Sequence, residues 1–215
     1  MKKLFALTVI LLFAIPSLSS GFYERQKIVL VTGFKPFGNW TANPSEVVAN
    51  LLNGCEIDNA KIVSIILPVD FNNSFEILKD AIAIYKPSII ISLGLDGMAH
   101  KIHVEKIAIN LECNEYRCKL IEKHGKFVQI SPLPAFKIAE EMRKHGYKAI
   151  PSFYAGTYVC NYIFYSTLSY IEENGLQIKA GFIHLPPLKS QRKYGMDADD
   201  MANAIKIAIK SVEYQ

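Results

Sequence analysis

The chain has 215 residues, of which half are hydrophobic and a fifth are charged, and its formal net charge is +4. This composition can bury one sizeable core and suits a single domain. The small positive charge comes without a basic stripe interleaved with aromatic side chains, so it gives no reason to expect a nucleic-acid partner.

Residues 1–20 have the pattern of a secretory signal peptide. A charged start precedes an apolar run from Leu4 to Ile15, and small residues come after it. The run is shorter than the roughly 20 apolar residues that a transmembrane helix needs. We expect cleavage near Ser19 or Ser20, export to the periplasm or the exterior, no membrane contact after cleavage, and one domain over residues 21–215. The alternative is an uncleaved anchor or a misassigned start codon; without a leader the protein would be cytoplasmic.

A first strand is predicted over Lys27 to Thr32, because its apolar run is typical of a strand buried on both faces of a parallel sheet. Gly33 is expected to end this strand. The next loop carries three aromatic side chains beside turn residues: Phe34, Phe37 and Trp40. Large apolar side chains after the carboxyl end of a strand either cover the core or form the wall of a ligand pocket. The residues alone leave both possibilities open.

Strands and helices alternate through the rest of the chain. Strands are predicted over 61–69, 88–93, 103–110, 147–152 and 180–184, and helices over 43–52, 71–85, 135–144, 160–173 and 197–212. This rhythm favours right-handed crossovers, and therefore an α/β fold: a three-layer α/β/α sandwich around a mainly parallel twisted sheet. Residues 111–134 are polar and irregular, with a hairpin expected around 124–126.

The chain has four cysteines. Cys113 and Cys118 could close a small disulfide loop if the protein is exported, although spacing does not establish the geometry. A zinc site is the weaker interpretation, because no second Cys or His pair at suitable spacing accompanies them. Cys55 has no obvious partner in the sequence.

Cys160 is the candidate nucleophile. It lies in the first turn of the helix predicted over 160–173, just after a turn at Gly156. The unpaired N–H groups and the positive end of a helix dipole favour a thiolate there. A free cysteine is also a common buried packing residue, so its neighbours in the sequence decide between the two interpretations.

His184 and Glu105 supply those neighbours. His184 ends a short apolar strand, and the carboxyl ends of strands border the crevice in which open α/β sheets place their chemistry. Glu105 shares one face of its predicted strand with His103, Ile107 and Ile109, and an inward carboxylate is costly unless it is paired. Cysteine, histidine and carboxylate together provide the nucleophile, base and orienter of covalent acyl transfer.

Five segments add a more specific indication. They are 31–38 (VTGFKPFG), 43–45 (NPS), 104–110 (VEKIAIN), 155–162 (AGTYVCNY) and 181–186 (GFIHLP). In this order they resemble the motifs of pyroglutamyl peptidase I, also called pyrrolidone-carboxylate peptidase, a family of cysteine exopeptidases. The resemblance runs from about Lys27 to the C-terminus. It implies that peptides with an N-terminal pyroglutamyl residue are the substrates and that pyroglutamate is released, without a metal or organic cofactor.

The same resemblance implies roles for individual residues. Cys160, His184 and Glu105 would be the catalytic groups. Phe34 and Phe37 match the phenylalanines that hold the flat pyrrolidone ring, and Asn43 matches an asparagine that orders the pocket loop; these six residues form the expected site. Relatives often form tetramers, which makes a homo-oligomer the expectation. They are usually cytosolic, so the leader at 1–20 is a departure.

A second departure lies in the loop before Glu105. Relatives typically carry a Gln soon after the first Gly and a Gly-Arg pair before the glutamate, whereas this chain has Leu95 and Met98-Ala99 at those positions. The difference bears on substrate fit more than on chemistry. Two alternatives therefore remain: a cysteine amidase or peptidase of the same fold with altered specificity, and a non-catalytic binding module.

Overall fold

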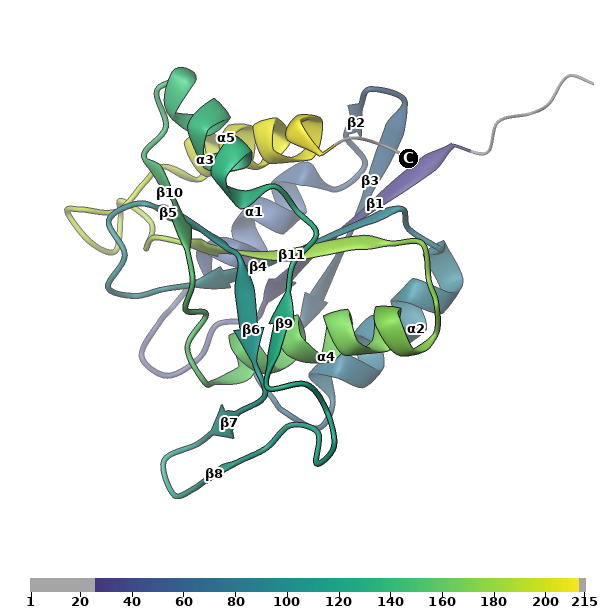
Figure 1. Cartoon of the computed structure of the whole chain (residues 1–215). Coiled ribbons are helices and arrows are strands. Elements are labelled where there is room, and N and C mark those ends of the chain that lie inside the picture. The colour runs from purple at the N-terminus through teal and green to yellow at the C-terminus, as the bar shows by residue number, and fades with distance from the viewer. Residues whose placement is uncertain (1–25, 213–215) are drawn as a thin grey trace, which may run out of the picture.

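A computed structural model describes residues 26–212 (Figure 1). The predicted signal peptide, residues 1–20, lies outside the described residues. At the centre is a seven-stranded sheet in the order β10-β5-β11-β4-β1-β3-β2. Neighbouring strands run parallel except for the pairs β11/β5 and β3/β2. The strands are β1 (Lys27–Phe34), β2 (Glu56–Ile57), β3 (Ala60–Leu67), β4 (Ile89–Leu95), β5 (Ile102–Glu105), β10 (Ala149–Ser152) and β11 (Lys179–Leu185).

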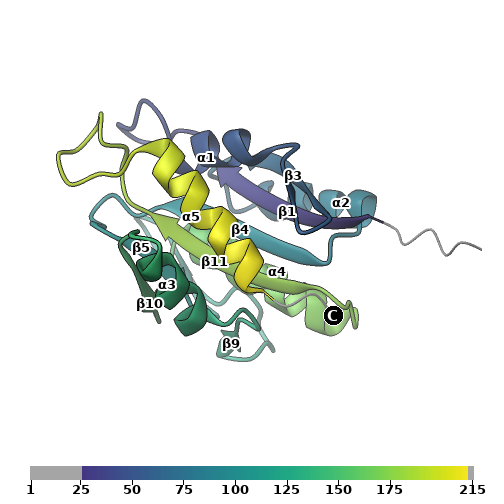
Figure 2. The same cartoon turned by 90° about the horizontal axis from the view of Figure 1, so that it is seen from above.

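Helices cover both faces of this sheet, which confirms the predicted three-layer fold. On one face α1, α3 and α5 pack together, and on the other α2 packs beside α4 (Figures 1 and 2). The helices are α1 (Pro44–Leu52), α2 (Ser74–Tyr85), α3 (Ala135–Lys144), α4 (Val159–Glu173) and α5 (Ala198–Ser211).

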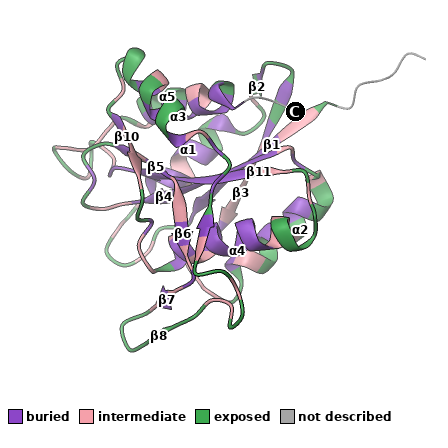
Figure 3. Cartoon of the chain, viewed as in Figure 1, coloured by how far each residue is buried: buried purple, intermediate pink, exposed green. Residues whose placement is uncertain are grey.

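The two faces of the sheet bury separate apolar clusters, because successive side chains of a strand point to opposite faces. Leu93, Val104 and Ile183 belong to the cluster under α1, α3 and α5. Phe182 and Leu30 belong to the cluster under α2 and α4. Both central strands, β4 and β11, are buried along nearly their whole length (Figure 3). Residues on the α4 face of these strands are therefore the ones that can meet Cys160.

The strand predicted over 103–110 is broken at Lys106, which corrects the sequence-based expectation. β5 stays in the main sheet, whereas β6 (Ile107–Ile109) pairs with β9 (Val128–Ile130) in a small separate sheet. The backbone N–H of Lys106 donates to the carbonyl of Ser152 at 2.7 Å, and its ammonium donates to the carbonyl of Ser131 at 2.6 Å. These contacts turn the chain, so Ile107 and Ile109 do not share a sheet face with Glu105 as predicted.

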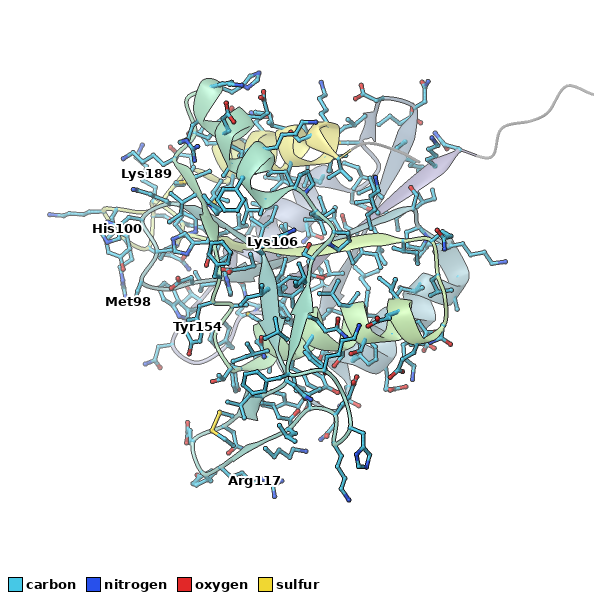
Figure 4. The ribbon with its side chains drawn as sticks, viewed as in Figure 1. Met98, His100, Lys106, Arg117, Tyr154 and Lys189 are labelled. Atoms are coloured by element: carbon cyan, nitrogen blue, oxygen red, sulfur yellow. A yellow bond between two sulfur atoms is a disulfide. The ribbon has the colours of Figure 1, made fainter. Side chains whose placement is uncertain are left out.

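A short disulfide-closed hairpin comes after β6. β7 (Glu112–Cys113) pairs with β8 (Cys118–Lys119), and Cys113 and Cys118 form the disulfide that the sequence left open (Figure 4). The hairpin predicted around 124–126 is wrong: the chain turns there, but β8 and β9 on either side of the turn pair with β7 and β6 and not with each other. The disulfide-closed hairpin lies against the start of α4, since the N–H of Cys113 donates to the carbonyl of Thr157 at 2.7 Å.

Candidate active site

The turn before α4 sets the position of Cys160. Gly156 has a φ of +79°, a left-handed conformation that glycine adopts without strain. Tyr158 occupies the N-cap position in an extended conformation, and its side chain makes no capping hydrogen bond. The first N–H groups of α4 therefore keep their capacity to bind an anion beside Cys160, a half-buried free thiol.

The structure brings Cys160, His184 and Glu105 together. Nδ1 of His184 and Oε1 of Glu105 are 2.9 Å apart, and both side chains are almost fully buried. The thiol of Cys160 also lies close enough to His184 to raise the pKa of its imidazole. The imidazole therefore lies between the sulfur and the carboxylate, as nucleophile, base and orienter require.

Four strands carry residues of the α4 face to about the level of His184. His184 on β11 pairs with Gly94 on β4 and, on its other side, with His103 on β5. The ladder between β1 and β4 ends at Thr32 and Ser92, and Phe34 and Gly94 each come two residues further along their strands, on the same face as this last pair. A row on the α4 face thus runs across four strands: Phe34, Gly94, His184 and His103.

Gly94 is a point of close approach between α4 and the sheet. A Cβ built at Gly94 would lie 2.9 Å from Sγ of Cys160 and 2.7 Å from Cζ of Phe182. Only the missing side chain allows the sulfur to sit this close to the strand. The Phe182 ring also packs against the His184 ring, with centroids 4.9 Å apart.

The electrostatics of His184 result from these contacts. Burial disfavours the charged imidazole and by itself lowers the pKa of His184. The hydrogen bond and charge of Cys160, and then those of Glu105, outweigh burial and raise the pKa of His184 from 6.5 to about 10. The protonated imidazole therefore has two stabilising neighbours, the carboxylate of Glu105 at Nδ1 and the sulfur of Cys160. Oε2 of Glu105 is buried and has no hydrogen-bond partner within residues 26–212.

The predicted pocket loop is ordered by the start of α1. Asn43, fully buried, accepts a hydrogen bond from the N–H of Ser45 at 3.0 Å and donates to the carbonyl of Lys35 at 3.1 Å. The hydroxyl of Ser45 accepts from the N–H of Phe34 at 2.9 Å. β1 therefore extends past Gly33 to Phe34, two residues beyond the predicted end.

Two hollows flank the loop and the start of α4. A cavity of about 480 Å³ is bounded by Phe37, Trp40 and Arg192 among others. A second cavity, of about 350 Å³, lies between the β3–α2 loop and the disulfide hairpin and includes Phe71 and Tyr158 in its wall. Phe34 is almost fully buried, whereas Phe37 is half-buried, so the two phenylalanines present different amounts of surface to a ligand.

Comparison with known proteins places the chain in a family. The sequence profile of pyroglutamyl peptidase matches residues 27–214. A pyrrolidone-carboxylate peptidase of Brachyspira hyodysenteriae is 37% identical over 199 residues, which cover 86% of this chain and 98% of that protein. The chain belongs to the pyroglutamyl peptidase family.

Solved structures agree with this assignment. Pyroglutamyl peptidase I of Bacillus amyloliquefaciens matches with a TM-score of 0.83 at 36% identity, over 86% of this chain and 94% of that one. Pyrrolidone carboxyl peptidase of Thermococcus litoralis matches with a TM-score of 0.82 at 32% identity, over 86% and 92%. The resemblance drawn from the five motifs is confirmed.

The loop after β4, where the chain departs from the family pattern, offers few polar groups at the altered positions. Leu95 and Ala99 are buried, whereas Met98 is 81% exposed and projects from the edge of the molecule near His100 (Figure 4). Two aromatic residues from other loops contact this loop at Gly97. A Cβ at Gly97 would meet the Trp40 ring, and the hydroxyl of Tyr194 donates to the carbonyl of Gly97 at 2.8 Å.

Asn161 is a residue whose role the sequence did not reveal. It is fully buried, accepts from the N–H of Ile109 at 3.0 Å, and donates to the carbonyls of Ile109 and Leu111 at 2.8 and 2.9 Å. It thereby ties the β6–β7 segment to the first turn of α4. A polar residue directly after the candidate nucleophile was the available signal.

Residues 26–212 contain neither a metal cluster nor a membrane span. Within this range no three His, Cys, Asp or Glu side chains are grouped so that they could hold a metal ion. Nor does any helix in the same range combine the length and apolar character needed to span a bilayer.

Proposed function

We propose that this chain is a cysteine peptidase that hydrolyses the amide bond after an N-terminal pyroglutamyl residue of a peptide and releases pyroglutamate. Its family and its fold support this function. The observation that carries it is the grouping of Cys160, His184 and Glu105 at the start of α4, where Glu105 hydrogen-bonds His184 and Cys160 lies close enough to raise the pKa of the imidazole.

The reaction proceeds through an acyl-enzyme. The sulfur of Cys160, its proton held by His184, attacks the carbonyl carbon of the pyroglutamyl residue, and the unpaired N–H groups at the start of α4 face the oxygen that becomes negative. His184 gives its proton to the leaving amine as the C–N bond breaks. Water, deprotonated by His184, then attacks the thioester and frees pyroglutamate, and the thiol is restored. Glu105 orients the ring and stabilises the imidazolium throughout.

The pyrrolidone ring of the substrate would be bound by the loop after β1. Phe34 on β1 and His184 on β11 lie on opposite sides of β4, the strand whose Gly94 approaches the sulfur of Cys160, so Phe34 is on the side available to the acyl part of the substrate. We propose that Phe34 and Phe37 hold the flat pyrrolidone ring there and that Asn43 fixes their loop through Lys35. An apolar wall suits a ring that carries no charge.

The direct test uses chromogenic amides. Pyroglutamyl arylamide is expected to be cleaved, whereas the prolyl arylamide, which has the same ring without its carbonyl, is not. Cys160→Ser should abolish nearly all turnover, and Cys55→Ser, at the other free thiol, should not change it. Undiminished cleavage by Cys160→Ser would refute the mechanism.

One observation favours a second candidate, an amidase or peptidase of the same fold with altered specificity. The positions at which relatives carry Gln and Gly-Arg hold Leu95, Met98 and Ala99, two of them buried apolar residues. Cleavage of other N-acyl arylamides at rates above that of the pyroglutamyl compound would support this candidate.

We also propose export through a cleaved leader at residues 1–20. Its charged start and short apolar run support the proposal, and so does the Cys113–Cys118 disulfide, a bond typical of oxidising compartments. N-terminal sequencing of the natural protein should find a start near residue 20; retention of Met1 would contradict it. The tetramer suggested by relatives is tested by light scattering.

A further inference from the structure

His103 occupies a position in the active-site row that the mechanism does not use. It pairs directly with His184 across β5 and β11, and residues opposite each other on antiparallel strands point to the same face. Its side chain is 24% exposed, so it is more open to solvent than that of His184, at 9%. His103 is therefore the neighbour of the general base on the open side of the site.

The proposed reaction indicates which part of the substrate lies near His103. In the proposed function the acyl side of the substrate faces Phe34 on β1, and the sulfur of Cys160 lies close to Gly94 on β4. The leaving amine must meet His184 on β11 to receive its proton. The scissile bond consequently runs across the sheet from β1 toward β5. The rest of the substrate, on the amine side of this bond, continues toward His103.

Asp96 lies within ion-pair distance of the ring of His103, on the side of Nδ1. Oδ2 of Asp96 is 3.6 Å from Nδ1 of His103. Asp96 is itself fixed, because its N–H donates to the carbonyl of Leu185 at 3.0 Å and its Oδ1 accepts from the N–H of Met98 at 3.0 Å. With Nδ1 turned to the carboxylate, Nε2 is the ring nitrogen left for a ligand.

We propose that His103, oriented by Asp96, is a specificity-determining residue that hydrogen-bonds the peptide group on the amine side of the scissile bond. This inference rests on the proposed function. The ligand class is a peptide continuing beyond the residue after pyroglutamate, whose amide N–H and C=O reach Nε2. An arylamide leaving group has no such peptide group.

The test compares two substrates in each variant. For His103→Ala, kcat/KM for pyroglutamyl-alanyl-alanine should fall by about tenfold, the upper end for a single hydrogen bond. The same variant should lose less than about twofold on pyroglutamyl arylamide. Asp96→Asn should also lose more kcat/KM on the peptide than on the arylamide, by a smaller factor. This second variant keeps the test valid if His103→Ala folds poorly. His124→Ala, at an exposed histidine on another loop, serves as the control and should change neither value.

Two results would overturn the inference. Equal losses on both substrates would indicate a structural role, and unchanged cleavage of the peptide by His103→Ala and Asp96→Asn would show that the ring does not touch it. Failure of the proposed function is distinguishable, because the unmodified protein would then leave the pyroglutamyl arylamide uncleaved.

Discussion

Gly94→Ala tests whether the position of the sulfur depends on a missing side chain. The new methyl group would lie 2.9 Å from Sγ of Cys160 and 2.7 Å from Cζ of Phe182, whereas ordinary contact begins at 3.4 Å. The sulfur must therefore move by about 0.5 Å and the ring by about 0.7 Å. A displacement near 1 Å can cost on the order of 100-fold in rate, so we expect kcat/KM to fall by roughly 10- to 100-fold.

The assay is cleavage of pyroglutamyl arylamide, together with denaturant unfolding. Overpacking should lower the free energy of unfolding of Gly94→Ala by about 1–3 kcal/mol. Leu93→Ala is the matched control: Leu93 is fully buried on the opposite face, so it should lose about 2–5 kcal/mol of stability while the folded protein keeps its kcat. The close approach at Gly94 is shown to be unimportant if Gly94→Ala keeps kcat/KM within twofold, or if Leu93→Ala loses as much activity.

Three further predictions concern stability. Asn161→Ala leaves backbone groups of the β6–β7 segment without partners, and urea unfolding should show that the free energy of unfolding falls by about 1–3 kcal/mol. An unchanged unfolding midpoint would show that these hydrogen bonds do not stabilise the fold. The raised pKa of His184 means that the folded state favours the protonated ring. Protonation of His184 therefore adds to the free energy of unfolding; this stabilisation is complete below pH 6.5 and is lost as the pH approaches about 10. The difference in unfolding free energy between the wild type and His184→Gln should shrink over that range, and a constant difference would contradict the pKa shift. Replacing Cys113 and Cys118 by Ser should cost about 2 kcal/mol, the loop entropy of a short disulfide, measured against Cys55→Ser.

That Cys160 and His184 would lie together could be predicted from sequence because each sits at the end of a regular element. Cys160 comes after a glycine turn at a helix start, and His184 ends an apolar strand before two prolines, so local pattern places both at the same edge of a sheet. Glu105 was identifiable because it interrupts an apolar face.

The neighbours of these groups could not be predicted, because they depend on register between distant strands. β5 runs antiparallel to β11 within a sheet expected to be mainly parallel, and this pairing is what sets His103 beside His184. The break at Lys106 depends on carbonyls of Ser152 and Ser131, 25 or more residues away. No local periodicity records such contacts, whereas the five motifs and the helix patterns are local.

Trapping the acyl-enzyme tests the role of Cys160 most directly. Cys55→Ser protein, mixed briefly with pyroglutamyl arylamide and quenched in acid, is digested and analysed by mass spectrometry. We predict a pyroglutamyl group on the peptide that contains Cys160, and its absence after prior alkylation with iodoacetamide, together with loss of turnover. Full turnover after complete alkylation of Cys160 would contradict a covalent mechanism at this sulfur.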